Sequence, residues 1–276
     1  MPELPEVETV RRILEPQIAG KVVEAVELRN AQVIAYPEAE QFAALPQGQR
    51  IQNISRRGKF LTLHFENGDR LSLHLRMTGQ LLVMSEGEPL EKHTHLILSL
   101  SDGNQLRYID VRRFGRFWYF QKDETDALTG QDALGPEPTD PILTAEYLKS
   151  KLGRWKKTIK ELLHDQAVVA GIGNIYSDEI LFEAGIYPGA KCGALSDADW
   201  RRLASAIPEV ILSGIEADQM TPEEYLRGKG KEYRNTEHLR VYGRNGQPCP
   251  TCGEALFRKV IGGRSSTYCP NCQKAY

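Results

Sequence analysis

Two Cys-x-x-Cys pairs near the C-terminus constrain the fold of this 276-residue chain more than any other feature. The pairs are Cys249–Cys252 and Cys269–Cys272, with sixteen residues between them. Two such turns bring four thiolates into a tetrahedron, the geometry that Zn²⁺ takes in structural sites. No histidine lies within this frame, and four thiolates complete the coordination shell. The spacing therefore predicts one structural Zn²⁺ ion without an open position for catalytic water; a metal-free cluster is the alternative.

Composition excludes several classes of protein. Hydrophobic residues make up 41% of the chain and charged residues 26%, as in ordinary globular proteins. No apolar run approaches the ~20 residues that a membrane helix needs, and residues 1–20 are too charged for a signal peptide. We therefore expect a cytoplasmic protein without a membrane partner, and a monomer because no apolar stripe asks for a second subunit. In that compartment the paired cysteines indicate a metal site and not disulfides, which leaves Cys192 as a free thiol.

The charges are segregated along the chain, although the net charge is only −2. Residues 227–276 contain ten Lys or Arg against three Asp or Glu, and residues 149–160 contain six Lys or Arg and no acid. Local basic clusters of this kind can follow a nucleic-acid backbone while the whole chain stays slightly acidic. A solvated basic surface is the alternative for each cluster taken singly.

The apolar pattern predicts an α+β protein of two domains. Residues 21–28, 60–65 and 71–75 alternate as strands do, which indicates an antiparallel β-sandwich behind a leading helix. Three prolines within residues 136–141 indicate a linker. Helical spacing follows at 145–152, 156–164, 176–184 and 197–215. We predict a sandwich domain at 1–133, a linker at 134–143, a helical domain at 144–236 with a mobile loop at about 217–237, and a zinc finger at 237–276.

The first residues have the chemistry of a nucleophile. Removal of Met1 would leave Pro2 with a secondary amine, and an α-amino group titrates near pH 8, so a useful fraction is unprotonated at neutral pH. Glu3 and Glu6 lie in the first turn of the expected helix, where the helix dipole favours negative charge. An ordinary capped helix without catalytic function explains the same residues.

Three stretches together resemble the formamidopyrimidine-DNA glycosylase/endonuclease VIII family. They are the opening Pro2-Glu-Leu-Pro5, the segment from Asp165 to Tyr176 with its Gly-Ile-Gly-Asn, and the finger that runs from Val241 to Gln273. The resemblance covers nearly the whole chain. It implies a helix-two-turn-helix in the helical half, a zinc-finger β-hairpin with the tip Gly262-Gly263-Arg264, and double-stranded DNA containing oxidised bases or abasic sites as the partner.

The resemblance also implies roles for individual residues. Pro2 would be the nucleophile and Glu3 the acid/base residue, with Glu6, Lys59 and Arg264 in support. Void-filling residues would be Met77, Arg112 and Phe114, with Arg112 facing the orphaned cytosine. Further DNA contacts would come from His74, Lys156, Asn174, Tyr242 and Arg264. By themselves, Met77 and Phe114 are more typical of a core, Asn174 of a helix N-cap, and Arg56 to Lys59 of a solvated turn.

The function implied by the resemblance is a bifunctional DNA glycosylase and AP lyase that removes 8-oxoguanine and formamidopyrimidines by β,δ-elimination. Residues 217–225 and 229–235 depart from the loop pattern of family members that read 8-oxoguanine. That departure leaves oxidised pyrimidines, in the manner of endonuclease VIII, as an alternative substrate. A zinc-finger protein that binds damaged DNA without cutting it is a further alternative, which the intact Pro2-Glu3 pair disfavours.

Overall fold

The computed structural model describes residues 2–153, 156–228, 230 and 237–275. The chain divides into two compact units, one made of residues 1–132 and 218–234, the other of residues 133–217 and 235–276. Within the described residues, no helix is long and apolar enough to cross a membrane.

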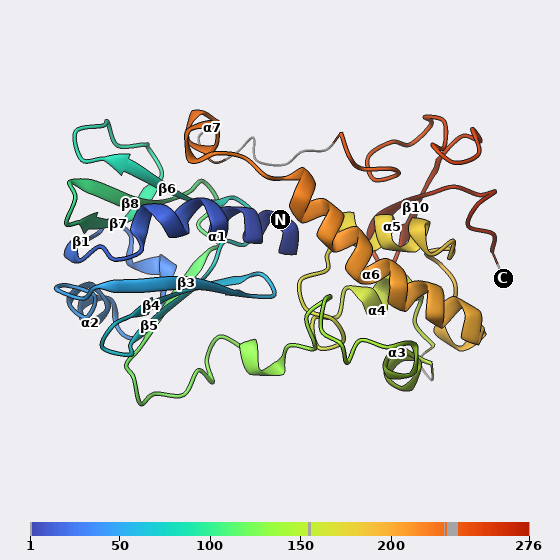
Figure 1. Cartoon of the computed structure of the whole chain (residues 1–276), viewed down its shortest axis with the longest axis horizontal. Helices are drawn as coiled ribbons and strands as arrows, with labels where there is room; N and C mark the ends of the chain where they lie inside the picture. Colours follow the sequence, from blue (N-terminus) through green and yellow to red (C-terminus); the bar gives the residue numbers. More distant parts are fainter. Residues whose placement is uncertain (1, 154–155, 229, 231–236, 276) are drawn as a thin grey trace. The chain divides into compact units, whose positions relative to one another are not determined.

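The first unit is a β-sandwich with a leading helix (Figure 1). One sheet has the order β1-β7-β8-β6, and the other has the order β2-β9-β5-β4-β3. All neighbouring strands are antiparallel except β2 and β9, which are parallel. The first sheet comprises β1 (Val23–Leu28), β6 (Gly79–Ser85), β7 (Thr94–Leu100) and β8 (Asn104–Asp110). The second comprises β2 (Ile34–Tyr36), β3 (Ile51–Arg57), β4 (Phe60–Phe65), β5 (Arg70–His74) and β9 (Arg116–Phe120), and a short helix α2 (Ala39–Ala44) follows β2.

Helix α1 (Leu4–Ile18) contacts β3 and β6, the edge strands of the two sheets, and so lies across the opening of the sandwich (Figure 1). Pro5 lies in its first turn, where a missing N–H costs no hydrogen bond. Val7, Val10, Ile13 and Leu14 form its buried face and join the core of the sandwich. The predicted leading helix and its apolar face are therefore present.

The segment expected to be a mobile loop at 217–237 contains a short helix, α7 (Pro222–Arg227). Thr221 caps it by accepting a hydrogen bond from the Glu224 N–H, and the Glu224 carboxylate accepts one from the Thr221 N–H. Tyr225 and Met220 pack into the core of the first unit, and α7 contacts α1. For this reason residues 218–228 pack with the sandwich unit.

The second unit is helical, with a hairpin at its end. Its helices are α3 (Ala145–Leu152), α4 (Ile159–Leu163), α5 (Asn174–Glu183) and α6 (Asp197–Ala217). Helix α4 is shorter than the predicted 156–164, because Thr158 and Glu161 form a capping box that begins it at Ile159. Strands β10 (Phe257–Ile261) and β11 (Arg264–Tyr268) pair through Gly262 and Gly263, whose φ angles are 56° and 75°. Positive φ at both positions is what a tight two-residue hairpin requires.

Residues 134–143 form no helix or strand, but they pack against the helical unit. The Gly135 N–H donates to the Gln166 carbonyl at 2.8 Å, and the Ala170 N–H donates to the Pro136 carbonyl at 2.9 Å. A side chain at Gly135 would meet the backbone of Val168 at 2.6 Å. The segment is therefore held in place along its N-terminal part.

Candidate active site and nucleic-acid interface

The N-terminus is held by a carboxylate in the first turn of α1. Glu3 is the N-cap residue, and its backbone N–H donates to Glu6 Oε2 at 2.7 Å. Glu3 and Glu6 are almost fully buried, and Pro2 is buried beside them. Glu6 thus fixes the peptide that joins Pro2 to Glu3, and with it the position of the proline ring. Met1 lies outside the described residues, so its removal stays a prediction.

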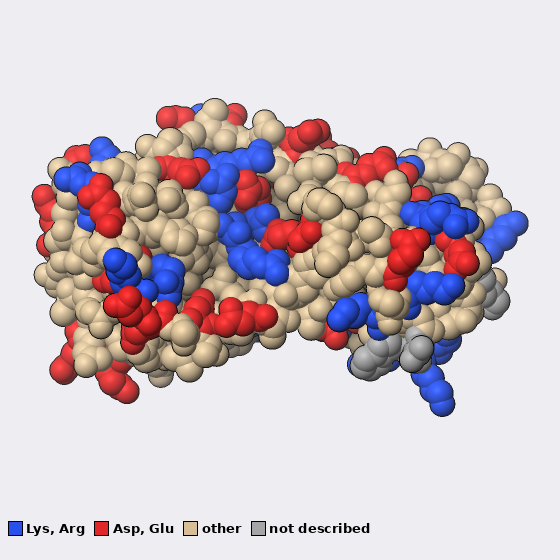
Figure 2. Space-filling view, turned by 60° about the horizontal axis from the view of Figure 1, so that its bottom comes forward, with Lys and Arg blue, Asp and Glu red and all other residues tan. Residues whose placement is uncertain are grey.

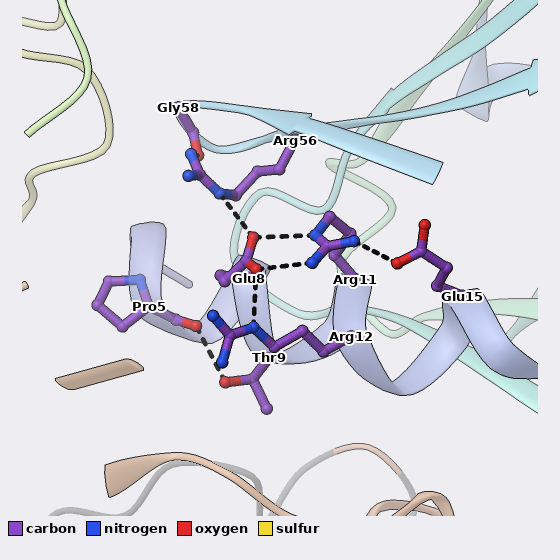
Figure 3. Close-up of polar contacts among 8 residues, drawn as sticks. All are labelled: Pro5, Glu8, Thr9, Arg11, Arg12, Glu15, Arg56 and Gly58. Atoms are coloured by element: carbon purple, nitrogen blue, oxygen red, sulfur yellow. Dashed lines mark hydrogen bonds and ion pairs between the residues drawn. The ribbon is translucent and has the colours of Figure 1, made fainter. Parts of the chain in front are cut away.

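One turn further along α1, Glu8 gathers three arginines (Figure 3). Its carboxylate accepts hydrogen bonds from Arg11 at 2.9 and 3.0 Å, from Arg12 at 2.8 Å and from Arg56 of β3 at 3.2 Å. Burial by itself would raise the pKa of Glu8, but these bonds and the positive charges of Arg11 and Arg56 outweigh burial and lower it to about 2. Glu8 therefore remains ionised at every physiological pH.

The Glu8 cluster ties α1 to the turn that leads to Lys59. Arg56 also donates to the carbonyl of Gly58 at 3.2 Å, which fixes the turn between β3 and β4. The sequence had indicated only a basic turn at Arg56, and Glu8 was not singled out. The spacing of Glu8 from Arg11 and Arg12, three and four residues along a helix, was the signal that could have identified it.

Lys59 directly precedes β4, and His74 is the last residue of β5. Lys59 is buried, and the register places its neighbour Phe60 opposite His74, with the two rings 4.7 Å apart edge to face. Burial, together with the charges of Arg76 and Lys59, lowers the pKa of His74 to about 3. The His74 ring is therefore neutral at pH 7. Because Nδ1 accepts the Arg76 N–H at 2.9 Å, the proton lies on Nε2, which is available to donate to an anion.

A buried carboxylate, Asp110 at the end of β8, joins the two loops that carry the expected void-filling residues. It accepts hydrogen bonds from the Thr78 hydroxyl at 2.5 Å, the Tyr108 hydroxyl at 2.8 Å, and the backbone N–H groups of Arg112 and Gly115 at 3.1 and 3.0 Å. Burial opposes the ionised form, but these bonds hold the pKa of Asp110 below its ordinary value. The 75–78 loop and the 111–115 loop are therefore fastened to one point.

The apolar residues on these loops are exposed. Met77 is 41% exposed and Phe114 is 46% exposed, so neither is a core residue. The Arg112 guanidinium lies 4.5 Å from the centre of the Phe114 ring, the stacked arrangement of a cation–π pair. A side chain at Gly115 would approach the Tyr108 hydroxyl to 1.8 Å, so only glycine fits behind the Phe114 tip. Their contact with DNA stays a prediction.

In the second unit, Asn174 begins α5 and is not its N-cap, since Gly173 occupies that position in extended backbone. Its Oδ1 atom is buried and has no hydrogen-bond partner within the described residues. At a helix N-terminus, N–H groups point outward and the dipole favours an anion, which suits the expected phosphate contact. Lys156 and Lys157 are both exposed ahead of α4, and the structure does not distinguish which of the two would reach DNA.

Two acidic residues of α5 hold the zinc-finger segment. Asp178 accepts a hydrogen bond from Lys160 of α4 at 2.6 Å and another from the Thr267 N–H at 2.9 Å, while Lys160 also donates to the Ser265 carbonyl at 3.0 Å. Glu179 accepts three backbone N–H groups from residues 240–242 at 2.7 to 2.9 Å, including that of Tyr242. Burial raises the pKa of Asp178 to about 6, against the opposing effect of Lys160. The sequence did not single out these residues.

The four cysteines of the finger converge as the spacing predicted. Their sulfur atoms all lie within 4.8 Å of one another. The N–H of Thr251 donates to Cys249 Sγ and the N–H of Cys272 to Cys269 Sγ, each at 3.4 Å, which is the bonding of thiolates held in Cys-x-x-Cys turns. The donor set of four sulfurs fits one structural Zn²⁺ ion. Arg264 lies exposed at the adjacent hairpin tip.

The predicted residues fall into two groups, one in each unit, and Lys and Arg side chains form separate clusters on the surface with Asp and Glu between them (Figure 2). Comparison with known protein families identifies the family to which these residues belong. Residues 1–117 match the formamidopyrimidine-DNA glycosylase N-terminal domain, residues 134–225 match its H2TH domain, and residues 246–275 match a zinc finger found in FPG and IleRS. This chain belongs to the formamidopyrimidine-DNA glycosylase family.

Relatives in the formamidopyrimidine-DNA glycosylase family match over their full length. Proteins named formamidopyrimidine-DNA glycosylase from Desulforamulus reducens and Pelotomaculum thermopropionicum are 46% and 43% identical to the chain, over 100% and 99% of each sequence. A structure of Lactococcus lactis Fpg with DNA containing an abasic site superposes with a TM-score of 0.89 at 33% identity, covering 99% of both chains. The predicted α+β fold with a helix-two-turn-helix and a zinc-finger hairpin is thereby confirmed.

Proposed function

We propose that this protein is a bifunctional DNA glycosylase and AP lyase, in which the Pro2 nitrogen attacks oxidised nucleotides in duplex DNA. The observation that carries the proposal is the N-terminus itself. Pro2 and Glu3 directly precede α1, and the Glu6 carboxylate fixes the peptide between them at 2.7 Å. The full-length match to formamidopyrimidine-DNA glycosylases supports the same conclusion.

The substrate follows from the relatives. Lactococcus lactis Fpg has been crystallised with DNA containing an abasic site and with DNA containing an N7-benzyl-Fapy-dG. For this chain we assign oxidised purines, 8-oxoguanine and formamidopyrimidines, as the principal lesions, with the protein acting as a monomer. Because the proposed substrate is genomic DNA, we also propose that the protein is localised in the compartment that holds the genome, which in bacteria is the cytoplasm.

Chemistry begins with base extrusion. Flipping a nucleotide from the duplex costs a few kcal/mol, and less for a damaged pair. Met77 and Phe114 are exposed on loops joined by Asp110 and would fill the vacated space, while Arg112 would donate to the orphaned base. Pairing of Arg112 with the Phe114 ring keeps both side chains at the tip of the same loop.

The covalent step then uses the unprotonated Pro2 amine. Its nitrogen forms a bond to C1′ as the bond from C1′ to the base breaks, and the base leaves with the bonding electrons and takes up a proton. Glu3 protonates the ring oxygen so that the sugar opens and an iminium ion forms. The iminium acidifies the neighbouring C2′ proton, whose loss expels the 3′ phosphate; a second elimination expels the 5′ phosphate.

Other residues bind and orient the DNA. Neutral His74 would donate a hydrogen bond from Nε2 to the DNA backbone, and Lys59 would supply positive charge to the DNA strand bound by the sandwich unit. Asn174, Lys156, Tyr242 and Arg264 supply contacts from the helical unit. The four cysteines would hold a Zn²⁺ ion that supports the finger and takes no part in the reaction.

Lesion choice is the finer part of the proposal. Helix α7 occupies residues 222–227 of this segment, and the sequence around it departs from the loop pattern expected of 8-oxoguanine readers. We propose that the lesion-capping contacts differ accordingly. A specific observation favours a second substrate class, since a Lactococcus lactis Fpg structure contains DNA with an oxidised pyrimidine. Oxidised pyrimidines are therefore the second candidate substrates.

Borohydride trapping across a lesion panel tests the proposal. Purified protein would be reacted with duplexes containing 8-oxoguanine, formamidopyrimidine, thymine glycol, 5-hydroxyuracil or an abasic site, with intact mass measured first to establish loss of Met1. We expect a trapped adduct with all lesions and fastest excision of the purines. Preference for the pyrimidines would replace the assigned substrate. Binding without any adduct would identify a damage-binding protein that does not cut.

A further inference from the structure

The zinc-finger hairpin has one edge that is covered by helices. The Ser265 carbonyl of β11 accepts a hydrogen bond from Lys160 of α4 at 3.0 Å. The Thr267 N–H of the same strand donates to Asp178 of α5 at 2.9 Å. Lys160 and Asp178 are almost fully buried and bond to each other at 2.6 Å. Helices α4 and α5 therefore occupy the outer edge of β11.

The edge of β10 on the other side of the hairpin is open. Val260 pairs with Ser265, and Arg258 pairs with Thr267. In an antiparallel pair, two opposite residues direct their N–H and C=O groups either toward each other or both away. Because Ser265 and Thr267 use theirs on α4 and α5, Val260 and Arg258 direct theirs away from β11. Within the described part of the chain, no other residue bonds to these outward main-chain groups.

Apolar and basic side chains are exposed along the same strand. Phe257 is 52% exposed and Val260 is 67% exposed, and Arg258 and Lys259 between them are also exposed. The order along β10 is thus apolar, basic, basic, apolar. Residues 255–276 contain four Lys or Arg and no Asp or Glu. An edge with outward main-chain groups and exposed apolar side chains is one to which a further strand can add.

Charge and hydrogen-bonding capacity decide which partner fits this edge. Two β10 strands from two copies of the chain would bring Arg258 and Lys259 against the same cations, and opposed like charges destabilise a strand pair. A phosphate backbone only accepts hydrogen bonds, so it would make no use of the outward carbonyls or of the two apolar side chains. An extended peptide with acidic residues satisfies the main chain, the cations and the apolar positions together.

We propose that the open edge of β10 binds an extended acidic segment of a partner protein by β-strand addition. The main chain of that segment would pair with the N–H and C=O groups of Arg258 and Val260. Its carboxylates would lie opposite Arg258 and Lys259, and its apolar side chains would meet Phe257 and Val260. The complementary pattern in the partner is therefore apolar, acidic, acidic, apolar. The proposed catalytic function uses none of these four residues, so the inference goes beyond it.

The test uses the zinc-loaded full-length protein and a fluorescently labelled synthetic peptide of about ten residues with the core Val-Glu-Glu-Val. One control peptide has the core Val-Lys-Lys-Val, which reverses the charge. A second control has the original core with every core nitrogen methylated, which retains the side chains and removes the N–H donors. Binding would be measured by fluorescence anisotropy.

We expect the Val-Glu-Glu-Val peptide to bind and each control peptide to bind at least roughly tenfold more weakly. Amide hydrogen exchange reports the main-chain bonds directly. The bound peptide should slow the exchange of the Arg258 and Val260 amides at least roughly tenfold, because their N–H groups become paired. The Lys259 amide, which faces β11, should change little.

A substitution in β10 removes one of these bonds from the protein side. Val260→Pro deletes an outward N–H without deleting a bond between β10 and β11, so we expect it to weaken peptide binding roughly tenfold. The matched control is Val260→Ile, which retains the N–H and should bind as the wild type does. Zinc content and thermal unfolding would establish that both variants fold. The N-methylated peptide tests the same bonds independently of the proline variant.

Three results would overturn the proposal. They are equal binding of the three peptides, no binding of the Val-Glu-Glu-Val peptide up to about 1 mM, and binding without slower exchange at Arg258 and Val260. If Val260→Pro instead weakened binding of an abasic-analogue duplex and no peptide bound, the edge would be a DNA contact and not a protein-docking site.

Discussion

Buried carboxylates position most of the functional groups in this protein. Glu6 holds the peptide at Pro2, Glu8 holds the turn before Lys59, and Asp110 holds the loops of Met77 and Phe114. Each carboxylate accepts hydrogen bonds from another turn or another element. These charge-assisted bonds compensate the free-energy cost of burying the carboxylate. The sequence predicted which groups would touch DNA, because their motifs are local. It did not identify Glu8 or Asp110, because their partners come together only after folding.

Pro2→Gly tests the nucleophile at this scale. Glycine retains an α-amine but is a primary amine without the ring that fixes its orientation, so we expect the rate of borohydride trapping to fall by roughly 100-fold or more. Affinity for an abasic-analogue duplex should change little. An unchanged trapping rate would show that another amine is the nucleophile.

Glu8→Gln tests the arginine cluster. The pKa of Glu8 is about 2 against an ordinary value of 4.5, so ionised Glu8 stabilises the fold fully above pH 4.5, and this contribution disappears as the pH falls towards 2. We expect the variant to lose roughly 1–3 kcal/mol of unfolding free energy at pH 7. The difference from wild type, measured by denaturant unfolding, should shrink between pH 4.5 and 2.5. A difference independent of pH would contradict the assigned ion pairs.

At the scale of elements, local sequence signals predicted the elements whose ends depend on neighbouring residues. The start of α1, the Gly-Gly hairpin and helix α3 follow from prolines, glycines and caps in the sequence. Helix α7 was missed because six residues are too few for an apolar period, and its buried Tyr225 packs against elements distant in sequence. The attachment of the finger to α5 was missed for the same reason, since Asp178 and Glu179 each reach partners in the finger.

Cys252→Ser tests the finger as an element. Loss of one thiolate should release most of the zinc and free the hairpin that carries Arg264, so we expect lower thermal stability and roughly tenfold weaker DNA binding or worse. Chelation of the wild type should reproduce both effects. The matched control is Cys192→Ser, outside the cluster, which should retain zinc. Normal DNA binding by the Cys252 variant would contradict the assigned role of the finger.

For the molecule as a whole, charge placement matters more than net charge. The chain carries −2 overall, yet its cations are concentrated at residues 149–160 and 227–276. Acidic residues in the same sequence form capping boxes and ion pairs with their own elements. A nearly neutral protein can therefore bind a polyanion strongly through selected surfaces.

A salt titration tests this expectation. If about four phosphates are neutralised, raising the salt from about 50 to 200 mM should weaken binding to an abasic-analogue duplex on the order of 100-fold. The measurement is the slope of the logarithm of the affinity against the logarithm of salt concentration. A slope near zero would mean that phosphate contacts contribute little, contrary to the roles given to Lys59, Asn174 and Arg264.

Asp110 also bears on how such an enzyme can be altered. Its carboxylate fastens the bases of two loops, whereas Met77, Arg112 and Phe114 project beyond them. Because the Asp110 contacts do not involve the side chains of Met77, Arg112 and Phe114, each of these can be substituted without loosening the loops. To obtain a new opposite-base preference, those three side chains should be varied and Thr78, Tyr108 and Gly115 retained. These three residues bond to Asp110 and keep the two loops in place.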